Sequence, residues 1–206
     1  MGVDGSRWLK ISGVCGVVTP VVAFACILLA IAYYPPFSWT NNALSDLGVQ
    51  EGVTSILFNV GLTISGILAA VFGFGLGGSF RGKTLGLGGA ALFLLAAVSL
   101  AAIGVFNENY KPMHLYASVA FFVLFPLSTL VIAAAFLNQR QMRLGLFTFT
   151  IAAIAASPWI AYFAVRYVEG VAIPETISAL AASAWAIVLG ERMLKQASRQ
   201  AALQMR

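Results

Sequence analysis

Residues 53–79 read VTSILFNVGLTISGILAAVFGFGLGGS, a run of 27 residues without one charged side chain. A helix rises about 1.5 Å per residue, so about 20 such residues cross the hydrocarbon core of a bilayer. Lipid offers no hydrogen bonds to an exposed backbone, so a run like this crosses as a helix. Five similar apolar runs flank it, separated by short polar loops. The six predicted spans are Leu9–Tyr34, Val53–Ser79, Thr84–Phe106, Met113–Leu137, Leu144–Tyr167 and Ile177–Leu189.

The composition also indicates a membrane protein. The chain has 206 residues, of which 60% are hydrophobic and 9% are charged, and its mean hydropathy is +0.91. A soluble domain is about a quarter charged. Six spans use most of the length and leave no room for a separate soluble domain. We therefore predict an all-α fold, an integral membrane bundle of six transmembrane helices forming one domain over residues 1–206, in a multi-pass protein of the cell membrane.

The charged residues divide between alternate loops and predict the orientation of the bundle. Ten of the 12 basic residues lie on one side: Arg7, Lys10, Arg81, Lys83, Arg140, Arg143, Arg192, Lys195, Arg199 and Arg206. Cytoplasmic loops carry the excess of Lys and Arg, so both termini are predicted to be cytoplasmic. The net charge of +5 is then explained by the orientation of the protein in the membrane, because the basic residues lie in alternate loops. We therefore expect no nucleic-acid partner. Two acids lie on this side, Asp4 and Glu191, and five lie on the outer side, Asp46, Glu51, Glu108, Glu169 and Glu175.

Two further patterns concern the helices themselves. Ser65, Ala69, Gly73 and Gly77 follow one another at four-residue spacing in the second span. Small residues at this spacing let helices approach closely in lipid, and the third span opens with several glycines. We expect the second and third spans to form a tight hairpin. The basic tail after Glu191 is predicted to extend the sixth span as a helix or to lie on anionic lipid.

The first outer loop, PPFSWTNNALSDLG at residues 35–48, is the most distinctive polar segment. Trp39, Ala43, Leu44 and Leu47 fall at helical spacing, whereas Asn42, Ser45 and Asp46 share another face. Ser38 is suited to cap a helix, and Gly48 is suited to the left-handed position after its end. We predict a short amphipathic helix at the membrane interface, with its polar stripe pointing into the bundle mouth or out to water.

Other polar side chains map to the same level of the predicted bundle. Asn59 lies about two turns into the second span, where an unpaired amide is costly, so it must find a partner across helices or toward the loop helix. Asn107 ends the third span, and His114, the one histidine, begins the fourth. Arg166 ends the fifth span, where an arginine snorkels to headgroups, pairs with Glu169 or binds an anionic ligand.

These residues define a candidate catalytic or binding site. Asp46 and His114 form a candidate acid/base or ligand pair, because a carboxylate can orient a histidine that titrates near neutrality. Ser45 is a candidate nucleophile on the condition that a base lies within hydrogen-bond reach. Asn42, Asn59, Asn107 and Arg166 are candidates for positioning or ligand binding. The alternative is that the whole cluster is structural, with these side chains satisfying one another and the backbone.

Cofactor signals are absent from the sequence. No Walker loop, dinucleotide glycine fingerprint, CxxC pair or HExxH occurs, and one histidine argues against a three-histidine zinc site. We therefore expect no cofactor and no metal. A carboxylate-rich Ca²⁺ or Mg²⁺ site from Asp46, Asn59 and Glu108 stays open as an alternative.

The segment Leu44–Gly48, the pair Phe58-Asn59 and the segment Gly104–Asn107, followed by His114, resemble a known pattern. Over roughly residues 9–194 the chain resembles a prokaryotic six-span family of unknown activity, domain of unknown function nine-nine-eight. That family is distantly similar to a eukaryotic group with the DRAM autophagy modulators and a GPI-anchor lipid-remodelling factor. Leu47 interrupts the Ser-Asp-Gly element of that group. The resemblance implies a shared site from Ser45, Asp46, Asn59 and His114, and it implies no particular reaction.

Three classes of function remain open. The first class is a membrane-embedded enzyme or lipid-handling protein with an outer site and membrane lipids as partners. The second class is a non-catalytic accessory subunit bound to other membrane-protein subunits. The third class, a small-molecule transporter, is weakened because no ionisable residue lies deep in a span. An enzyme requires a cavity that reaches Asp46 and His114, whereas a structural cluster requires those side chains to be packed and mutually satisfied.

Overall fold

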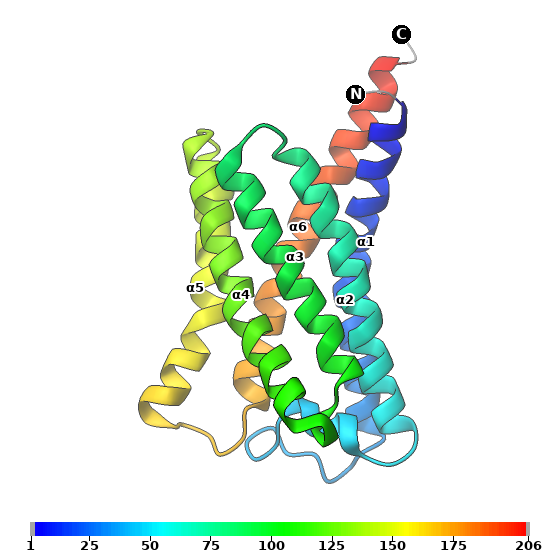
Figure 1. The fold of residues 1–206 in the computed structure, drawn as a ribbon, viewed down its shortest axis with the longest axis vertical. Coiled ribbons are helices and arrows are strands. Elements are labelled where there is room, and N and C mark those ends of the chain that lie inside the picture. Colours follow the sequence, from blue (N-terminus) through cyan, green and yellow to red (C-terminus); the bar gives the residue numbers. More distant parts are fainter. Residues whose placement is uncertain (1–2, 205–206) are drawn as a thin grey trace.

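The computed structural model describes residues 3–204, and the side chains of residues 5–203. Six long helices make up the chain: α1 (Val3–Ala32), α2 (Val53–Ser79), α3 (Thr84–Val105), α4 (Lys111–Asn138), α5 (Met142–Val165) and α6 (Ala172–Gln204). Two short 3₁₀ helices lie in loops, η1 (Leu44–Val49) and η2 (Glu108–Tyr110). All six long helices are long and apolar enough to cross a membrane, which confirms the predicted fold class (Figure 1).

The helix ends differ from the predicted spans where proline lies at a boundary. The fourth and sixth spans were expected to begin after Pro112 and Pro174, but α4 begins at Lys111 and α6 at Ala172. Proline is favoured in the first turn of a helix because the N–H that it lacks has no partner there. At its other end α6 continues past Leu189 to Gln204, so the tail extends the sixth span as a helix, which was one of the two alternatives predicted for it. Glu, Lys, Gln and Ala sustain a helix beyond the apolar segment.

The six helices form a closed ring. Each helix packs against its neighbour in sequence, and α6 packs back against α1 (Figure 1). A cluster of aromatic rings fills the centre, with Phe72 of α2, Phe93 of α3 and Trp185 of α6 packed edge to face or tilted. Trp185 is fully buried, and its indole N–H donates a 3.3 Å hydrogen bond to the hydroxyl of Thr148 on α5. One side chain therefore links α6 to α2, α3 and α5.

The predicted close approach of α2 and α3 is present. A methyl group added at Gly66 would overlap the backbone of Ala101, and one added at Gly104 would overlap the carbonyl of Asn59. A methyl group at Gly77, by contrast, would lie 3.8 Å from the nearest atom, in ordinary contact with Ala90. Gly73, one of the predicted small residues, also packs closely on α3, because an added Cβ there would lie 2.8 Å from a side-chain atom of Leu94. The glycines that bring these helices together therefore extend from the far end of the hairpin to Gly73 and do not include Gly77.

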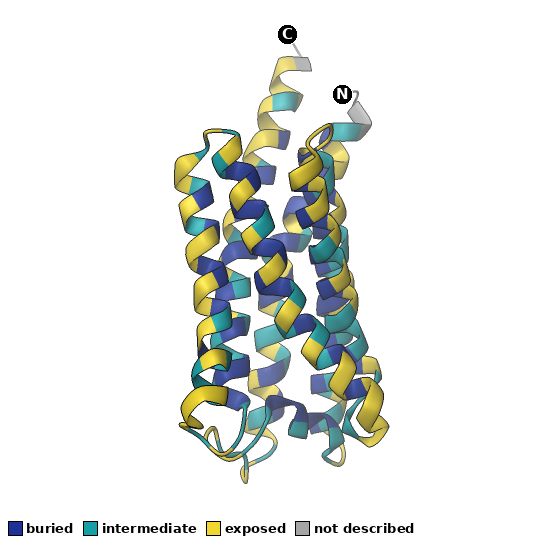
Figure 2. Ribbon diagram, turned by 60° about the vertical axis from the view of Figure 1, so that its left-hand side comes forward, coloured by how far each residue is buried: buried dark blue, intermediate teal, exposed yellow. Residues whose placement is uncertain are grey.

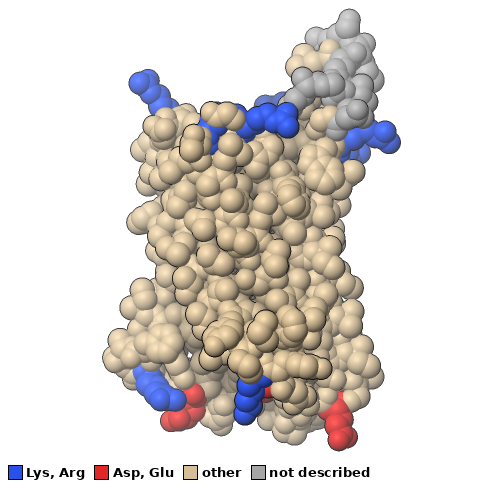
Figure 3. All heavy atoms as spheres, viewed as in Figure 1, with Lys and Arg blue, Asp and Glu red and all other residues tan. Residues whose placement is uncertain are grey.

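The surface of the bundle is apolar between two charged ends. Exposed residues follow the outward faces of the helices, and many of them are large hydrophobic side chains (Figure 2). In the view of Figure 3 no charged side chain lies on the band between the ends. We call the end with both termini and the turns at 80–83 and 139–141 the basic end. The opposite end, with the loops at 33–52, 106–110 and 166–171, is the acidic end. Arg206 and the side chain of Asp4 lie outside the described part.

Candidate functional site

The loop helix at the acidic end differs from the predicted interfacial helix. η1 begins at Leu44 and is a 3₁₀ helix, with Leu44, Ser45, Leu47 and Gly48 buried. Ser38 does not cap it, because η1 begins only after Ala43 and the hydroxyl of Ser38 pairs with that of Thr40 at 3.2 Å. The loop helix therefore sits inside the mouth of the bundle, where Leu47 is fully buried. An interfacial helix would leave one face in water, whereas this one is covered by α2, α6 and α1.

Glycine is required at position 48 because a side chain there would collide with Asn59, and not because the backbone is left-handed. The glycines with positive φ are Gly52 and Gly82 among the described residues, so the predicted left-handed position at Gly48 is wrong. A Cβ at Gly48 would lie 2.6 Å from Asn59 Oδ1. Asn59 Nδ2 donates a 2.8 Å hydrogen bond to the Gly48 carbonyl. The expectation that Asn59 pairs toward the loop helix is therefore confirmed.

Asp46 organises its own loop. Its Oδ2 accepts hydrogen bonds from Asn42 Nδ2 at 2.6 Å and from the backbone N–H of Ala43 at 3.0 Å. Its backbone carbonyl accepts a third hydrogen bond, from the side-chain amide of Gln50 at 2.8 Å. Asn42 and Asp46 lie together as the helical spacing predicted, and both are used to close the turn into η1.

His114 is buried, with 8% of its surface exposed, and lies in the first turn of α4. Its Nδ1 donates a 2.7 Å hydrogen bond to the carbonyl of Phe106, because a carbonyl can only accept. Its Nε2 lies 3.4 Å from the hydroxyl of Ser118. The histidine therefore ties α4 to the end of α3. Asp46 and His114 form no hydrogen bond with each other, so the direct pair expected from the sequence is not formed.

Asn107 and Arg166 lie at helix ends and take no part in the hydrogen bonds of Asp46 and His114. Asn107 Oδ1 accepts from the backbone N–H of Asn109 at 3.1 Å and so starts η2. Arg166 ends α5 in a left-handed conformation, with φ at 42°, and is exposed. Its guanidinium lies 5.9 Å from the ring centre of Tyr162, and no carboxylate within the described chain forms an ion pair with it.

Glu175 is the functional candidate that sequence reasoning missed. It lies in the first turn of α6 with 8% of its surface exposed, although it was expected in a solvated outer loop. Its Oε2 accepts a 2.6 Å hydrogen bond from the backbone N–H of Leu44. Pro174 followed by an acid is a typical helix-start pattern, and use of this signal would have placed Glu175 in the first turn of the sixth helix.

A second carboxylate reaches η1 from the other side. Ser45 Oγ donates a 2.6 Å hydrogen bond to Glu108 Oε1 in η2. Ser45 is buried, whereas Glu108 is half-buried. The condition set for Ser45 as a nucleophile, a base within hydrogen-bond reach, is therefore met, but by a glutamate and not by the histidine.

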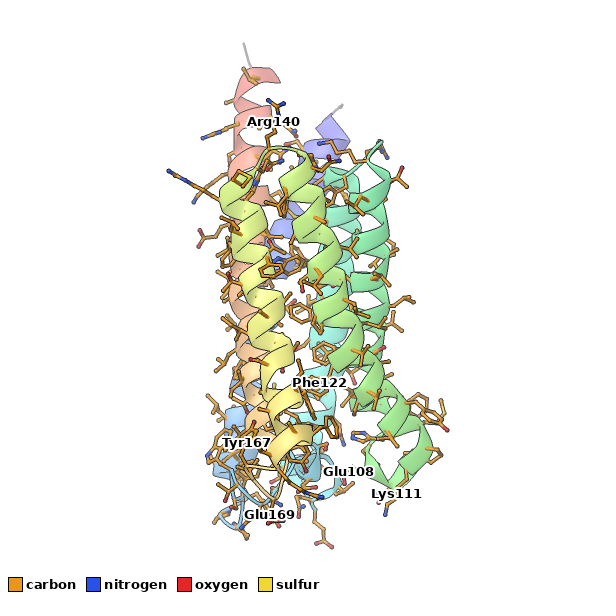
Figure 4. All side chains as sticks on the ribbon, turned by 90° about the vertical axis from the view of Figure 1, so that its left-hand side faces the viewer. Glu108, Lys111, Phe122, Arg140, Tyr167 and Glu169 are labelled. Atoms are coloured by element: carbon orange, nitrogen blue, oxygen red, sulfur yellow. The ribbon has the colours of Figure 1, made fainter. Side chains whose placement is uncertain are left out.

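Two hollows meet at this cluster. The first is an apolar cavity of about 110 Å³ inside the ring, and the second is a cleft of about 570 Å³ between the acidic-end halves of α4 and α5. Figure 4 looks onto these two helices, with Phe122 between them and Glu108 and Lys111 at the acidic end. The residues that line both hollows are Ser45, Ser118, Phe122 and Glu175.

The cleft combines groups capable of acid/base chemistry and of polar binding. Glu108, Lys111, His114 and Glu175 line it together with the hydroxyl of Ser45. Lys111 forms no ion pair within the described residues. In the same part of the chain, no group of three His, Cys, Asp or Glu side chains is placed to hold a metal ion. Of the residues suggested for a cation site, Asp46, Asn59 and Glu108 each bind a separate partner.

Comparison with known proteins places the chain in a family without assigning it an activity. No curated protein and no solved structure matches the chain. Residues 17–191 match the family described as protein of unknown function (DUF998), a range that covers most of the sequence and every residue of the candidate site. The chain therefore belongs to the DUF998 family.

Proposed function

We propose that this membrane protein binds an amphiphile, a lipid of the leaflet at the acidic end. The polar part of the ligand lies in the cleft, and one hydrocarbon chain lies in the apolar cavity. One observation carries the proposal: an apolar cavity inside the ring shares a boundary with a cleft that opens to the outside. The cleft is mostly apolar and carries a few polar side chains, and the residues that line both hollows are Ser45, Ser118, Phe122 and Glu175.

The dimensions of the cavity suit a hydrocarbon chain. Its volume of about 110 Å³ exceeds by far the ~10–15 Å³ that holds one water molecule. Its lining on α2 runs from Phe58 to Phe72, roughly 21 Å of helix axis at about 1.5 Å per residue. A lipid chain in one leaflet spans half of the ~30 Å hydrocarbon core.

The cleft provides a lateral entrance. Its walls on α4 include Leu115 and Val119, and its walls on α5 include Phe163, all of which are exposed on the apolar surface. Phe163 has 80% of its surface exposed. Large exposed apolar side chains beside a mostly apolar cleft with a few polar groups are suited to receive an amphiphile directly from the bilayer.

A second candidate function, acyl transfer, is favoured by the short hydrogen bond between Ser45 and Glu108. In that reaction Ser45 Oγ attacks an ester carbonyl of the bound lipid while Glu108 accepts the hydroxyl proton. The ester C–O bond then breaks, the alcohol part of the lipid leaves with the proton returned by Glu108, and the acyl group stays on Ser45 until a water or an acceptor hydroxyl takes it. Binding and acyl transfer use the same site, and they are distinguished by whether a covalent acyl-enzyme forms.

Native mass spectrometry of the purified full chain with a lipid extract tests the binding proposal. Ala182 lines the cavity from α6, so Ala182→Phe fills the cavity without removing a polar group. Ala184 is exposed on the same helix and provides the matched control, Ala184→Phe. Wild type and Ala184→Phe are expected to retain bound lipid, and Ala182→Phe is expected to lose most of it.

Equal lipid occupancy in all three proteins contradicts the proposal and favours the accessory-subunit alternative, in which the polar cluster only holds η1 in place. A mass increase equal to one acyl chain that survives denaturation in wild type, and is absent in Ser45→Ala, supports acyl transfer. If Ser45→Ala carries the same covalent mass, Ser45 is not the acylated residue.

A further inference from the structure

A second polar hollow lies at the basic end, far along the bundle from the cleft. Three separate segments meet there: the turn between α2 and α3, the turn between α4 and α5, and α6. Lys83 Nζ donates a hydrogen bond to Gln139 Oε1, and a guanidinium nitrogen of Arg192 donates to Gln141 Oε1 at 2.6 Å. The side-chain amide of Gln141 donates in turn to Gln139 Oε1 at 3.3 Å, so two glutamines connect the two cations.

The hollow has a volume of about 220 Å³ and no acidic residue in its lining. Its polar lining consists of Ser79, Lys83, Gln139, Gln141, Arg192 and Gln196. Both cations donate to neutral amide oxygens, which leaves their charge uncompensated. The one ion pair within the described residues, between Lys195 and Glu191 at 3.5 Å, is exposed and does not involve them.

The position of Arg192 is set by packing as well as by hydrogen bonding. Its guanidinium carbon lies 5.8 Å from the ring centre of Phe136 on α4, a cation–π distance. A guanidinium held on one side by an aromatic ring and on another by an amide has its remaining N–H groups free to face an acceptor. Arginine in this arrangement suits the paired oxygens of a phosphate, and a lysine beside it adds a second charge.

We propose that this hollow binds a phosphate group, and that the phosphate belongs to the headgroup of an anionic lipid. The hollow lies where the apolar helices end, at the level where lipid phosphates lie. Basic pockets between transmembrane helices on the cytoplasmic side typically bind anionic headgroups, and the distribution of Lys and Arg predicts that this end is cytoplasmic. A soluble phosphate has the same chemistry, so the test separates the two sources. This site is independent of the amphiphile site at the acidic end.

The test compares two double variants with the same change in charge. K83Q/R192Q removes both cations of the hollow, and R81Q/R143Q removes two exposed arginines at the same end that do not line it. Each protein is placed in nanodiscs of phosphatidylcholine with or without phosphatidylglycerol, and lipid retained through detergent extraction is counted by native mass spectrometry. Inorganic phosphate is added to the phosphatidylcholine samples as the soluble arm.

Wild type and R81Q/R143Q are expected to retain phosphatidylglycerol, and K83Q/R192Q is expected to retain it about tenfold less, since two charge-assisted contacts are lost. Equal loss in both double variants overturns the proposal, because attraction would then reflect overall charge. No selective retention by wild type overturns it as well. Stabilisation of wild type by inorganic phosphate alone supports a phosphate site and overturns the lipid source.

Because K83Q/R192Q could fold poorly, Arg192→Lys provides a second comparison. It keeps the charge but loses the planar fork of the guanidinium, so retention of phosphatidylglycerol is expected to fall between those of wild type and K83Q/R192Q. The proposal is overturned if Arg192→Lys retains as much phosphatidylglycerol as wild type and the two double variants have equal effects. The lipid would then be attracted by the overall charge of the basic end and not bound in the hollow.

Discussion

The carboxylate of Glu175 accepts a 2.6 Å hydrogen bond from the backbone N–H of Leu44, a residue 131 positions earlier in the chain. This contact joins the start of α6 to the start of η1, and both groups are buried. Ser45, the next residue, is held by Glu108 from the opposite side. Two carboxylates from distant segments thus position the loop helix over the two hollows.

Loss of the Glu175 carboxylate is expected to destabilise the acidic end. Glu175→Ala leaves the buried N–H of Leu44 without its acceptor, which costs about 1–3 kcal/mol. Glu175→Gln keeps an acceptor oxygen and is expected to cost less. Thermal unfolding in detergent, followed by circular dichroism, measures both. If the alanine variant unfolds at the wild-type temperature, the contact with Leu44 does not stabilise the fold.

A methyl group at Gly48 is expected to disturb the loop helix through contact alone. In Gly48→Ala the new Cβ lies 2.6 Å from Asn59 Oδ1, so either the asparagine or η1 must move. The expected loss of stability is about 1–3 kcal/mol, as for other overpacked positions. Gly88→Ala is the control, because no atom lies within 4 Å of its added Cβ. Comparable destabilisation of both variants would show that the packing at Gly48 is not specific.

The Ser45–Glu108 hydrogen bond is expected to appear as coupling in a double-mutant cycle. Ser45→Ala, Glu108→Gln and the double variant together isolate the pairwise free energy, expected at about 1–2 kcal/mol because the acceptor is charged but half-exposed. Chemical unfolding in a mild detergent provides the stabilities. Additive effects of the two single changes would mean that the bond contributes nothing to the folded state.

The orientation of the bundle is accessible to cysteine labelling. With Cys15 and Cys26 replaced by serine, single cysteines at Gly82 and at Glu169 report on the basic and acidic ends. An impermeant maleimide is expected to label position 169 in intact cells and position 82 only after the membrane is opened, since the basic end is predicted to be cytoplasmic. The reverse pattern would invert the predicted topology and place the proposed amphiphile site in the inner leaflet.

Structural features that the lipid environment alone imposes on a residue could be predicted from the sequence. Asn59 lies in an apolar helix, where an unpaired amide is costly, and its predicted partner in the loop is found at Gly48. The small residues of α2 predicted a close approach to α3, which Gly73 makes, whereas Gly77 does not and Gly66 and Gly104 make further close contacts. Periodicity indicates the face of a helix that packs, but the depth of each contact depends on how the partner helix is placed.

Residues whose role depends on distant contacts were not predictable. Asp46 and His114 lie at the same end of the bundle, as expected, yet each satisfies its hydrogen bonds with nearby groups and not with the other. Glu175 was expected in solvent because the start of α6 was placed too late. Moving that start to Ala172 turns a loop residue into a buried helical one.

By itself, the sequence determined that this protein is a bundle of six membrane-spanning helices. Lipid accepts no unpaired backbone, so the length and apolarity of each run are enough to decide its structure. Only the tertiary structure decided which polar groups meet. Hydrogen bonds such as Leu44 to Glu175 join segments that share no local pattern, and the two hollows exist only after the ring of helices has closed.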